Sequence, residues 1–488
     1  MSWSTRWRCD VFVKRHSACS PNNAADPPLD VCSATMVRLR LPEPVVAGTA
    51  GGPDGGEGVT DTRTDAEAGA EAVAETGAEA VAEADADGGL PTLPAVRSCP
   101  FAPPDEYLRL RDAGRAVRVR MPTGSTAWAL TRHADVRAVL GDPRFSSDRR
   151  LPQYPFFAPT QPSAHAPARI SLIGMDPPEH SRARRAVVGE FTVKRLEALQ
   201  PRVQQIVDEH VDRMLAGPRP VDLVEALALP VPSMVICELL GVPYADHDFF
   251  QTRSGLLLSR VPTVEERNQA RGELWGYLGR LIDAKAAAED PGDDLMGRQI
   301  ARQKAESGGV DREALIALGF LLLVAGHETT ANMISLGVMA LLSRPDQLAA
   351  LRADPSRTPA AVEEMLRIFT IAEFVNARVA TEDVELAGVL IREGEGVVAL
   401  SSVADHDPEV FPEPAALDFD RGARHHLAFG FGIHQCLGQN LARQELRTVF
   451  DTLIRRVPGL RLAVDPDELP YKDDAHVYGL HELPVTWD

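Results

Sequence analysis

A proline-free segment of 31 residues, 312–342, constrains the fold of this chain more than any other part of the sequence. Most of its side chains are apolar, and Asp311 before it can act as an N-cap by accepting a hydrogen bond from the first turn. A helix of this length would be about 45 Å long, at about 1.5 Å per residue. We therefore expect one helix that crosses the whole domain, with the other elements packed around it.

A polar hexapeptide, Ala-Gly-His-Glu-Thr-Thr at residues 325–330, interrupts the apolar surface of this segment. It begins like the helix motif of zinc proteases, but Ala331 stands where the second metal-binding histidine would be, so that interpretation fails. Thr329 can return its hydroxyl to a backbone carbonyl one turn back, which would bend the helix and open a small groove. We expect a break in backbone hydrogen bonding here, with Glu328 as a route for protons.

A glycine-rich loop, Phe-Gly-Phe-Gly-Ile-His-Gln-Cys-Leu-Gly at residues 429–438, places one cysteine directly before a predicted helix. The free N–H groups at that helix N-terminus would lower the pKa of the Cys436 thiol and favour a metal-ligating thiolate. Gly430, Gly432 and Gly438 would leave room for a flat ligand against the backbone. A dinucleotide fingerprint is excluded because Gln435 replaces its third glycine. The remaining alternative is a small buried cysteine in a turn.

Together, these motifs resemble those of the cytochrome P450 superfamily. Phe429, Gly432, Cys436 and Gly438 match the spacing of its haem-binding signature, and the hexapeptide is similar to its oxygen-activation motif. The resemblance covers residues 96–488 and is closest to the soluble bacterial class, including actinobacterial enzymes. It implies a mainly α (α+β) fold, in which a helix-rich domain carries small antiparallel β-sheets, and it implies haem b as the cofactor.

Three charged residues between the motifs match a further feature of this family. Glu364 and Arg367 lie three residues apart, so they can pair on one helix face, and Arg421 can join them from later in the chain. Such a pair alone is a weak signal. In this order along the chain it resembles the family's Glu-Arg-Arg scaffold, whose role would be structural.

The resemblance also implies contacts to the haem. Cys436 would ligate the iron, with Phe429, Gly430 and Gly438 against the porphyrin. Two buried haem propionates require cationic hydrogen-bond donors. The residues that match the family's propionate-binding positions are His180, Arg184, Arg378 and His434. Arg182 and Arg185 are expected to face solvent.

The implied activity is that of a haem-thiolate monooxygenase, which inserts one oxygen atom of O2 into a hydrophobic small molecule by hydroxylation or epoxidation. The substrate would be a secondary metabolite or a xenobiotic, and Glu328 and Thr329 would deliver protons. The expected substrate-pocket residues are Leu321, Val324, Ala325, Phe374 and Val375. The alternatives are a non-catalytic haem-binding gas sensor and a haem-thiolate nitric oxide reductase or peroxygenase. A sensor has no need of a proton relay, which favours the monooxygenase.

Composition limits the partners. A formal net charge of -19 argues against nucleic acid, and the longest apolar run, residues 314–326, is too short to span a membrane. Six cysteines without a disulfide pattern or an iron–sulfur spacing indicate a reducing cytoplasm. Electrons would then come from a separate ferredoxin or flavodoxin with its reductase, docking on a basic patch that includes Arg443. We expect a monomer.

The N-terminal part of the chain has a different composition. Residues 1–95 are expected to form a disordered, acidic extension rich in Ala, Gly and Glu, because the segment from about 45 to 95 has almost no large apolar side chain to bury. Residues 96–488 form the catalytic domain. We also hypothesise that residues 1–35 arise from an upstream start, with Met36 as the true initiator. The segment from Leu151 to Ala168, rich in proline and aromatic residues, is expected to be a functional loop.

Overall fold

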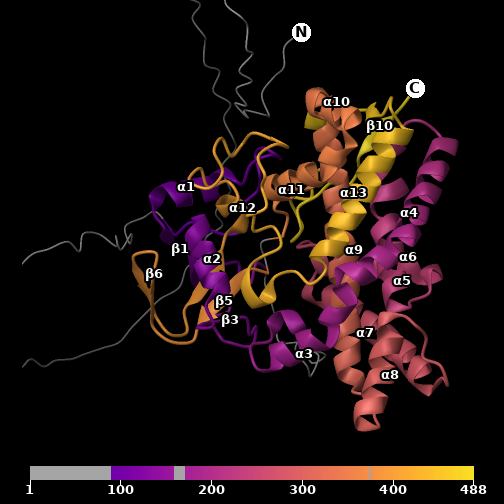
Figure 1. Ribbon diagram of the computed structural model, residues 1–488. Helices are drawn as coiled ribbons and strands as arrows, with labels where there is room; N and C mark the ends of the chain where they lie inside the picture. Colours follow the sequence, from indigo (N-terminus) through magenta and orange to yellow (C-terminus); the bar gives the residue numbers. More distant parts are fainter. Residues whose placement is uncertain (1–88, 159–170, 373–374) are drawn as a thin grey trace, which may run out of the picture. The chain divides into compact units, whose positions relative to one another are not determined.

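The computed structural model describes residues 89–158, 171–372 and 375–488 (Figure 1). Most of the expected N-terminal extension, residues 1–88, lies outside the described residues, as do Phe374 and positions 159–168 of the expected loop. The described unit begins before residue 96, because the Leu93 amide donates to the Arg120 carbonyl at 3.0 Å and the Leu93 side chain is buried.

The described chain is dominated by helices. The long helices are α1 Asp105–Ala113, α2 His133–Gly141, α3 Glu179–Val187, α4 Val193–Ala216, α5 Pro230–Leu240, α6 His247–Leu258, α7 Val264–Ala287, α8 Leu295–Ser307, α9 Arg312–Leu342, α10 Pro345–Ala353, α11 Thr358–Phe369 and α13 Gln439–Arg456. The short helical turns are η1 Leu172–Gly174, η2 Val188–Phe191, η3 Val224–Ala228, η4 Tyr244–Asp246, η5 Pro355–Arg357, α12 Ser401–Ala404, η6 Gly432–His434 and η7 Pro466–Glu468.

The expected long helix is confirmed with its expected bounds. The Asp311 side chain accepts from the Ala314 amide at 3.2 Å, as an N-cap should. In Figure 1, α4 to α8 gather on one side of α9, and α1, α2 and the largest sheet lie on the other. This is the helix-rich arrangement that the resemblance implied.

The predicted break in α9 is wrong. The helix runs from Arg312 to Leu342 without interruption, and the polar hexapeptide lies inside it. A Cβ added to Gly326 would lie 2.9 Å from Ile236 Cδ1 on α5. Gly326 therefore lets two core helices pack closely, and a continuous helix satisfies the backbone where it is tightly packed.

The strands form small sheets. They are β1 Ala116–Arg120, β2 Thr126–Leu130, β3 Phe145–Ser146, β4 Val221–Asp222, β5 Ala377–Ala380, β6 Val384–Leu386, β7 Val389–Ile391, β8 Gly396–Ala399, β9 Arg461–Leu462 and β10 Pro484–Thr486. The sheet orders are β1-β2-β8-β5-β3, β4-β10-β9 and β6-β7. All pairs are antiparallel except β2 with β8, which are parallel, so the largest sheet is mixed.

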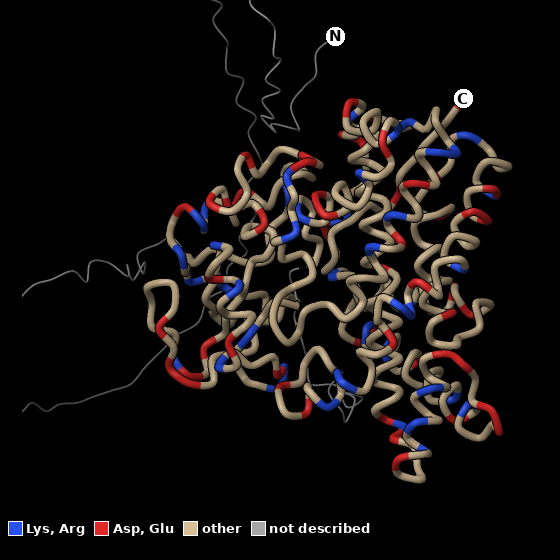
Figure 2. The backbone as a smooth tube through the Cα atoms, in the orientation of Figure 1, with Lys and Arg blue, Asp and Glu red and all other residues tan. Residues whose placement is uncertain are grey.

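The largest hydrophobic cluster surrounds α9. It includes Leu323 and Ile334 of α9, Val207 of α4, and Phe450 of α13. By length and composition, α9 is also the one helix of the described chain that could cross a bilayer, but more than half of its most apolar window is buried inside the protein. Acidic and basic residues are interspersed along the outer elements of the described chain (Figure 2).

Candidate functional site

The cysteine loop lies between α2 and the start of α13. Gly430 and Gly432 have positive φ angles of 68° and 73°, and the Cys436 amide donates to the Phe429 carbonyl at 2.8 Å, which closes the loop. A Cβ on Gly432 would overlap the Leu140 carbonyl at the end of α2, whereas one on Gly438 would meet no protein atom within 4 Å. Gly432 therefore serves packing within the protein, and Gly438 faces open space.

Cys436 lies deep in the protein but keeps part of its surface open. Burial raises the pKa of its thiol, while the amides of Gly438 and Gln439 and the guanidiniums of Arg184 and Arg443 act in the opposite direction. The expected lowering by the helix N-terminus is present but smaller than the effect of burial. A bound metal cation would supply the missing charge, because a coordinating thiol is deprotonated outright.

Arg378 is a buried cation without a carboxylate partner among the described residues. It lies in β5 with 3% of its surface exposed, and its Nη1 donates only to the carbonyls of Val375 and Ala377, at 3.2 and 2.8 Å. Burial lowers the pKa of this guanidinium. A buried charge in this state requires an anion that the described chain does not supply.

Two histidines near the loop also have ring nitrogens without protein partners. His180 of α3 is 1% exposed and neither ring nitrogen has a hydrogen bond, and Nε2 of His434 is buried and unpartnered. Their ring centroids are 4.2 Å apart. Burial lowers the pKa of both, that of His434 to about 3. Buried polar atoms in native proteins are nearly always hydrogen-bonded, so these atoms indicate a ligand.

Arg184 is placed differently from the other predicted propionate partners. Its Nη2 donates to the Gln435 carbonyl at 2.6 Å, so it ties α3 to the cysteine loop. Its remaining N–H groups have no hydrogen-bond partner within the described chain. Arg182 and Arg185 are exposed, as expected for solvent-facing residues.

One face of α9 remains open in the middle of an otherwise buried helix. Leu321, Val324, Ala325 and Thr329 are partly or fully exposed. Leu323, two residues from Leu321 and therefore on another side of the helix, is 1% exposed. Leu321, Ala325 and Thr329 recur every four residues, so they share a face. Thr329 donates its hydroxyl to the Ala325 carbonyl at 2.8 Å, as predicted. Val375 is also partly exposed, and Phe374 lies outside the described residues.

Glu328 has a partner that sequence reasoning missed. Lys472, more than a hundred residues later, places its Nζ 2.5 Å from Glu328 Oε1 and 2.9 Å from Asn332 Oδ1. Asn332 lies one helical turn after Glu328, so the lysine bridges two residues on one face of α9. Nothing in the local sequence around Lys472 indicates this contact, which depends on how the C-terminal segment returns to the core.

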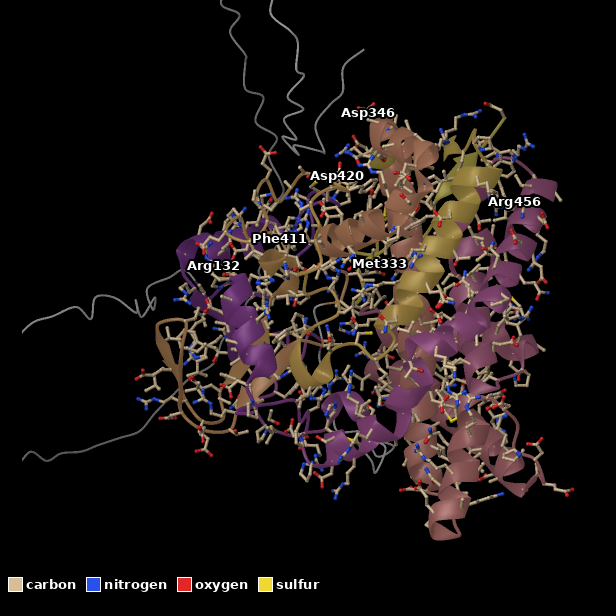
Figure 3. The ribbon with its side chains drawn as sticks, in the orientation of Figure 1. Arg132, Met333, Asp346, Phe411, Asp420 and Arg456 are labelled. Atoms are coloured by element: carbon tan, nitrogen blue, oxygen red, sulfur yellow. The ribbon has the colours of Figure 1, made fainter. Side chains whose placement is uncertain are left out.

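Glu364, Arg367 and Arg421 are brought together in the core. The guanidinium of Arg367 donates to Glu364 at 2.7 and 2.8 Å, and Arg421 Nε donates to the same carboxylate at 3.0 Å. Arg367 also bonds the carbonyls of Asp405, Pro414 and Ala416, at 2.8 to 3.2 Å. Its guanidinium lies 5.4 Å from the ring centroid of Phe411, which Figure 3 labels. The network joins α11 to the segment that leads to the cysteine loop.

Arg443 is not available as a docking cation. Its Nε and Nη2 lie 2.6 and 3.0 Å from the carboxylate oxygens of Glu363 on α11, and it stacks over Phe429 at 4.6 Å. His426 contacts the same carboxylate at 3.2 Å. The side chain therefore fastens the base of the loop.

These residues fit a haem group. The site has a partly open cysteine, and Gly430 and Gly438 leave room for a flat neighbour. Among the described residues it also has a buried guanidinium without a carboxylate and two imidazoles with unpartnered ring nitrogens, the donors that an iron porphyrin with two propionates requires. The open face of α9 offers apolar side chains and a hydroxyl. The geometry thus supports the haem contacts that the sequence predicted.

Comparison with known proteins agrees with this fit. Residues 246–470 match the family model described as Cytochrome P450. The pentalenic acid synthase of Streptomyces avermitilis is 52% identical over 395 residues, covering 81% of this chain and 96% of the relative. The vitamin D3 dihydroxylase of Streptomyces griseolus is 50% identical over 398 residues, covering 81% and 97%.

Solved structures give the same result. The cytochrome P450 MoxA from Nonomuraea recticatena is 57% identical, with a TM-score of 0.74 over 81% of this chain and 98% of that structure. CYP105P1 in complex with filipin I is 45% identical, with a TM-score of 0.77 over 82% and 99%. With its haem b cofactor and its monooxygenase chemistry, this chain belongs to the cytochrome P450 family.

Proposed function

We propose that Cys436 holds the haem iron as a thiolate and that Arg378, His180, His434 and Arg184 surround the haem propionates. The observation that carries this proposal is the set of buried nitrogen atoms without protein partners beside a partly open thiol. Phe429, Gly430 and Gly438 would border the porphyrin. When bound, a thiolate-ligated haem activates O2 so that one oxygen atom is inserted into an organic substrate.

The proton route is proposed to run through Glu328 and Thr329. Thr329 donates its hydroxyl proton to the Ala325 carbonyl, which keeps the hydroxyl on the open face of α9. The hydroxyl oxygen can still accept a hydrogen bond from a proton donor. The ion pair with Lys472 fixes the buried carboxylate of Glu328, one residue before Thr329. A carboxylate and a hydroxyl in successive positions can pass protons from the protein interior to the open face.

The proposed substrate is a hydrophobic small molecule of secondary or foreign metabolism. The relatives include an enzyme named for pentalenic acid and one named for vitamin D3. Leu321, Val324, Ala325 and Val375 offer partly exposed apolar surface for such a molecule. Hydroxylation or epoxidation of the substrate is the proposed reaction.

Electrons are proposed to come from a separate ferredoxin or flavodoxin with its reductase, and the protein is proposed to act as a cytoplasmic monomer. Among the described residues, no cluster of His, Cys, Asp or Glu could hold a metal centre for electron transfer. The side chain of Arg185 on α3, next in sequence to Arg184 at the loop, is an exposed cation that an acidic partner could contact.

The thiolate proposal is tested by the spectrum of the reduced protein with carbon monoxide. The wild type should show the red-shifted Soret band of thiolate ligation, and Cys436→Ala should lose it. Cys237→Ala is the matched control, because Cys237 is a buried free thiol on α5, and it should keep the band. A pigmented, folded wild type without the band would overturn the proposal.

The proton route is tested by Thr329→Val with a surrogate ferredoxin and reductase. Oxygen consumption should continue while product falls at least about tenfold, since a positioned proton donor contributes about 10²-fold or more. Thr330→Val is the control, because Thr330 is buried and bonds the Gly326 carbonyl at 3.3 Å. Equal product from both variants would contradict the route, and product formed with peroxide alone would favour a peroxygenase.

A further inference from the structure

A second open space lies beside the proposed site. It is a cavity of about 540 Å³, including its mouth, between the N-terminal segment 94–107, the residues after α6, the end of α11 and the C-terminal segment 472–478. Tyr107, Phe157, Ile371 and Tyr478 give it aromatic and apolar walls. Its lining also contains four basic side chains, which are Arg97, Arg260, Lys472 and His476.

Arg97 and Lys472 are already engaged in the protein. Arg97 donates to the carbonyls of Ala102 and Phe369, at 3.3 and 2.7 Å, and lies over the Tyr478 ring at 4.4 Å. Lys472 is paired with Glu328. These two cations therefore have structural partners and are not free to bind an external anion.

Arg260 differs from them. Its Nη2 donates to the Asp473 carbonyl, and its Nε and Nη1 have no hydrogen-bond partner within the described chain. No carboxylate of the described residues lies within ion-pair distance of it, although most other partly buried arginines, such as Arg253 with Glu273 at 2.8 Å, have one. Burial lowers the pKa of Arg260, more strongly than Tyr107, Asp474 and Asp473 raise it. The guanidinium thus has two donor nitrogens, Nε and Nη1, that can serve a ligand in the cavity.

Several arginines surround His476, although the cavity lining also includes one acidic residue, Asp473. Burial lowers the pKa of His476 to about 4, and the three charged groups with the largest further effects, Arg260, Arg267 and Arg149, all lower it. The Nε of Arg149 is buried without a partner. The imidazole of His476 is neutral, and the guanidinium of Arg260 has no carboxylate partner among the described residues. The positive potential around them favours the binding of an anion. This local charge is opposite to the formal net charge of -19 of the chain.

We propose that this cavity binds the carboxylate of an amphipathic substrate, with Arg260 as the residue that recognises it. The forked N–H donors of a guanidinium match the two oxygens of a carboxylate, and the aromatic walls accept the adjoining hydrocarbon. The proposal rests on the proposed function and narrows its substrate class to hydrophobic acids. Lys472 connects the cavity to Glu328, so the bound acid would extend from the cavity toward the open face of α9.

The experiment measures ligand-induced Soret shifts of the holoprotein with three pairs of probes, namely dodecanoic, abietic and 4-phenylbutyric acid, each with its methyl ester. The wild type should bind at least one acid about tenfold or more tightly than its ester, the size expected for a charge-assisted hydrogen bond. Arg260→Gln should remove that preference by weakening the acid alone, and Arg260→Lys should restore part of it.

Arg109→Gln is the control, because Arg109 on α1 has a side chain that is 71% exposed and a distant partner in Glu106 at 3.7 Å. It should bind acids and esters as the wild type does. Esters that bind as well as acids, a preference that survives Arg260→Gln, or no shift with any probe would overturn the proposal. A normal carbon monoxide spectrum in every variant separates these outcomes from a failure of the haem assignment.

Discussion

Two groups of buried arginines in this protein have opposite surroundings. Arg367 and Arg421 share the carboxylate of Glu364, and their other N–H groups reach backbone carbonyls. Arg378, which is equally buried, meets only two backbone carbonyls, and His180 and His434 beside the cysteine loop have unpartnered ring nitrogens. Burial is therefore not what distinguishes a ligand site from a scaffold.

The difference lies in whether the protein satisfies its own polar groups. A buried ion network in which every polar group has a partner holds the elements that it joins together. A network with unpaired groups destabilises the protein until a ligand pairs with them. By this criterion α11 and the segment before the loop form a scaffold, and the space bordered by Arg378, His180 and His434 is built for an anionic group. Each prediction below changes one member of this comparison.

The largest expected effect is at the scaffold. Arg367→Met leaves Glu364 buried with one fewer partner, which should lower the free energy of unfolding by about 3–5 kcal/mol. Urea unfolding of the apoprotein measures it. Arg357→Met is the control, since its partner Asp420 is 77% exposed, and it should cost about 1 kcal/mol or less. Similar losses in both variants would contradict the distinction between the two pairs.

Glu445 on α13 is a buried acid that, like Arg378, lacks a partner of opposite charge among the described residues. It is buried, its Oε2 has no partner, and burial raises its pKa to about 8. The unfolded chain releases this proton near pH 4.5 and the folded chain near pH 8, so stability should fall as pH rises between these values. Glu445→Gln should abolish that slope, which could reach about 5 kcal/mol at about 1.4 kcal/mol per pKa unit.

Thermal or urea unfolding of the apoprotein across this pH range measures the slope of the wild type and the variant. Glu197→Gln, which changes an exposed residue of α4, is the control and should leave the slope as it is. A wild type without loss of stability toward pH 8 would contradict this prediction. In that case a hydrogen-bond donor or a positive charge compensates the Glu445 carboxylate in solution, and its burial does not destabilise the protein.

A smaller effect of opposite sign is expected at Arg378. Removing an unpaired buried charge should stabilise the apoprotein by about 1–3 kcal/mol in Arg378→Met, although it removes a haem contact. Haem transfer to apomyoglobin should be faster from this variant than from the wild type, and Arg378→Lys should be intermediate. An apoprotein destabilised by Arg378→Met would mean that the guanidinium belongs to the scaffold.

The smallest effects separate two glycines of one loop. Gly438→Ala places its methyl group where no neighbouring atom lies within 4 Å, but alanine is a poorer N-cap than glycine for α13, so the apoprotein should lose about 1 kcal/mol or less while haem content after reconstitution falls. Gly432→Ala should destabilise the apoprotein by about 1–2 kcal/mol or more, because its φ is positive and its methyl group would overlap the Leu140 carbonyl. Equal haem content in Gly438→Ala and wild type would remove Gly438 from the site.

Local patterns predicted what depends on neighbours in the chain. The proline-free segment with its N-cap predicted α9 with its bounds. The hydroxyl bond of Thr329 needed only the carbonyl one turn back. Such features are decided by helix and turn geometry, which the residue order fixes.

Features that depend on packing were mispredicted or missed. The break in α9 does not occur because α5 packs against Gly326, and Arg443 is taken up by Glu363 on another helix. The thiol of Cys436 has a raised pKa because burial acts more strongly than the helix N-terminus. Each of these outcomes depends on how closely a distant element approaches, which no local spacing records.

The sequence by itself determined that this chain forms a helix-rich domain with a cysteine loop of haem-thiolate type, since motif spacing and helix periodicity act over a few residues. Only the tertiary structure decided which buried charges are paired and which await a ligand. Because the C-terminal segment folds back beside α9 and α6, Lys472 meets Glu328, whereas Arg260 finds no carboxylate partner among the described residues. Desolvation depends on the whole surrounding of a group, and that surrounding exists only in the folded chain.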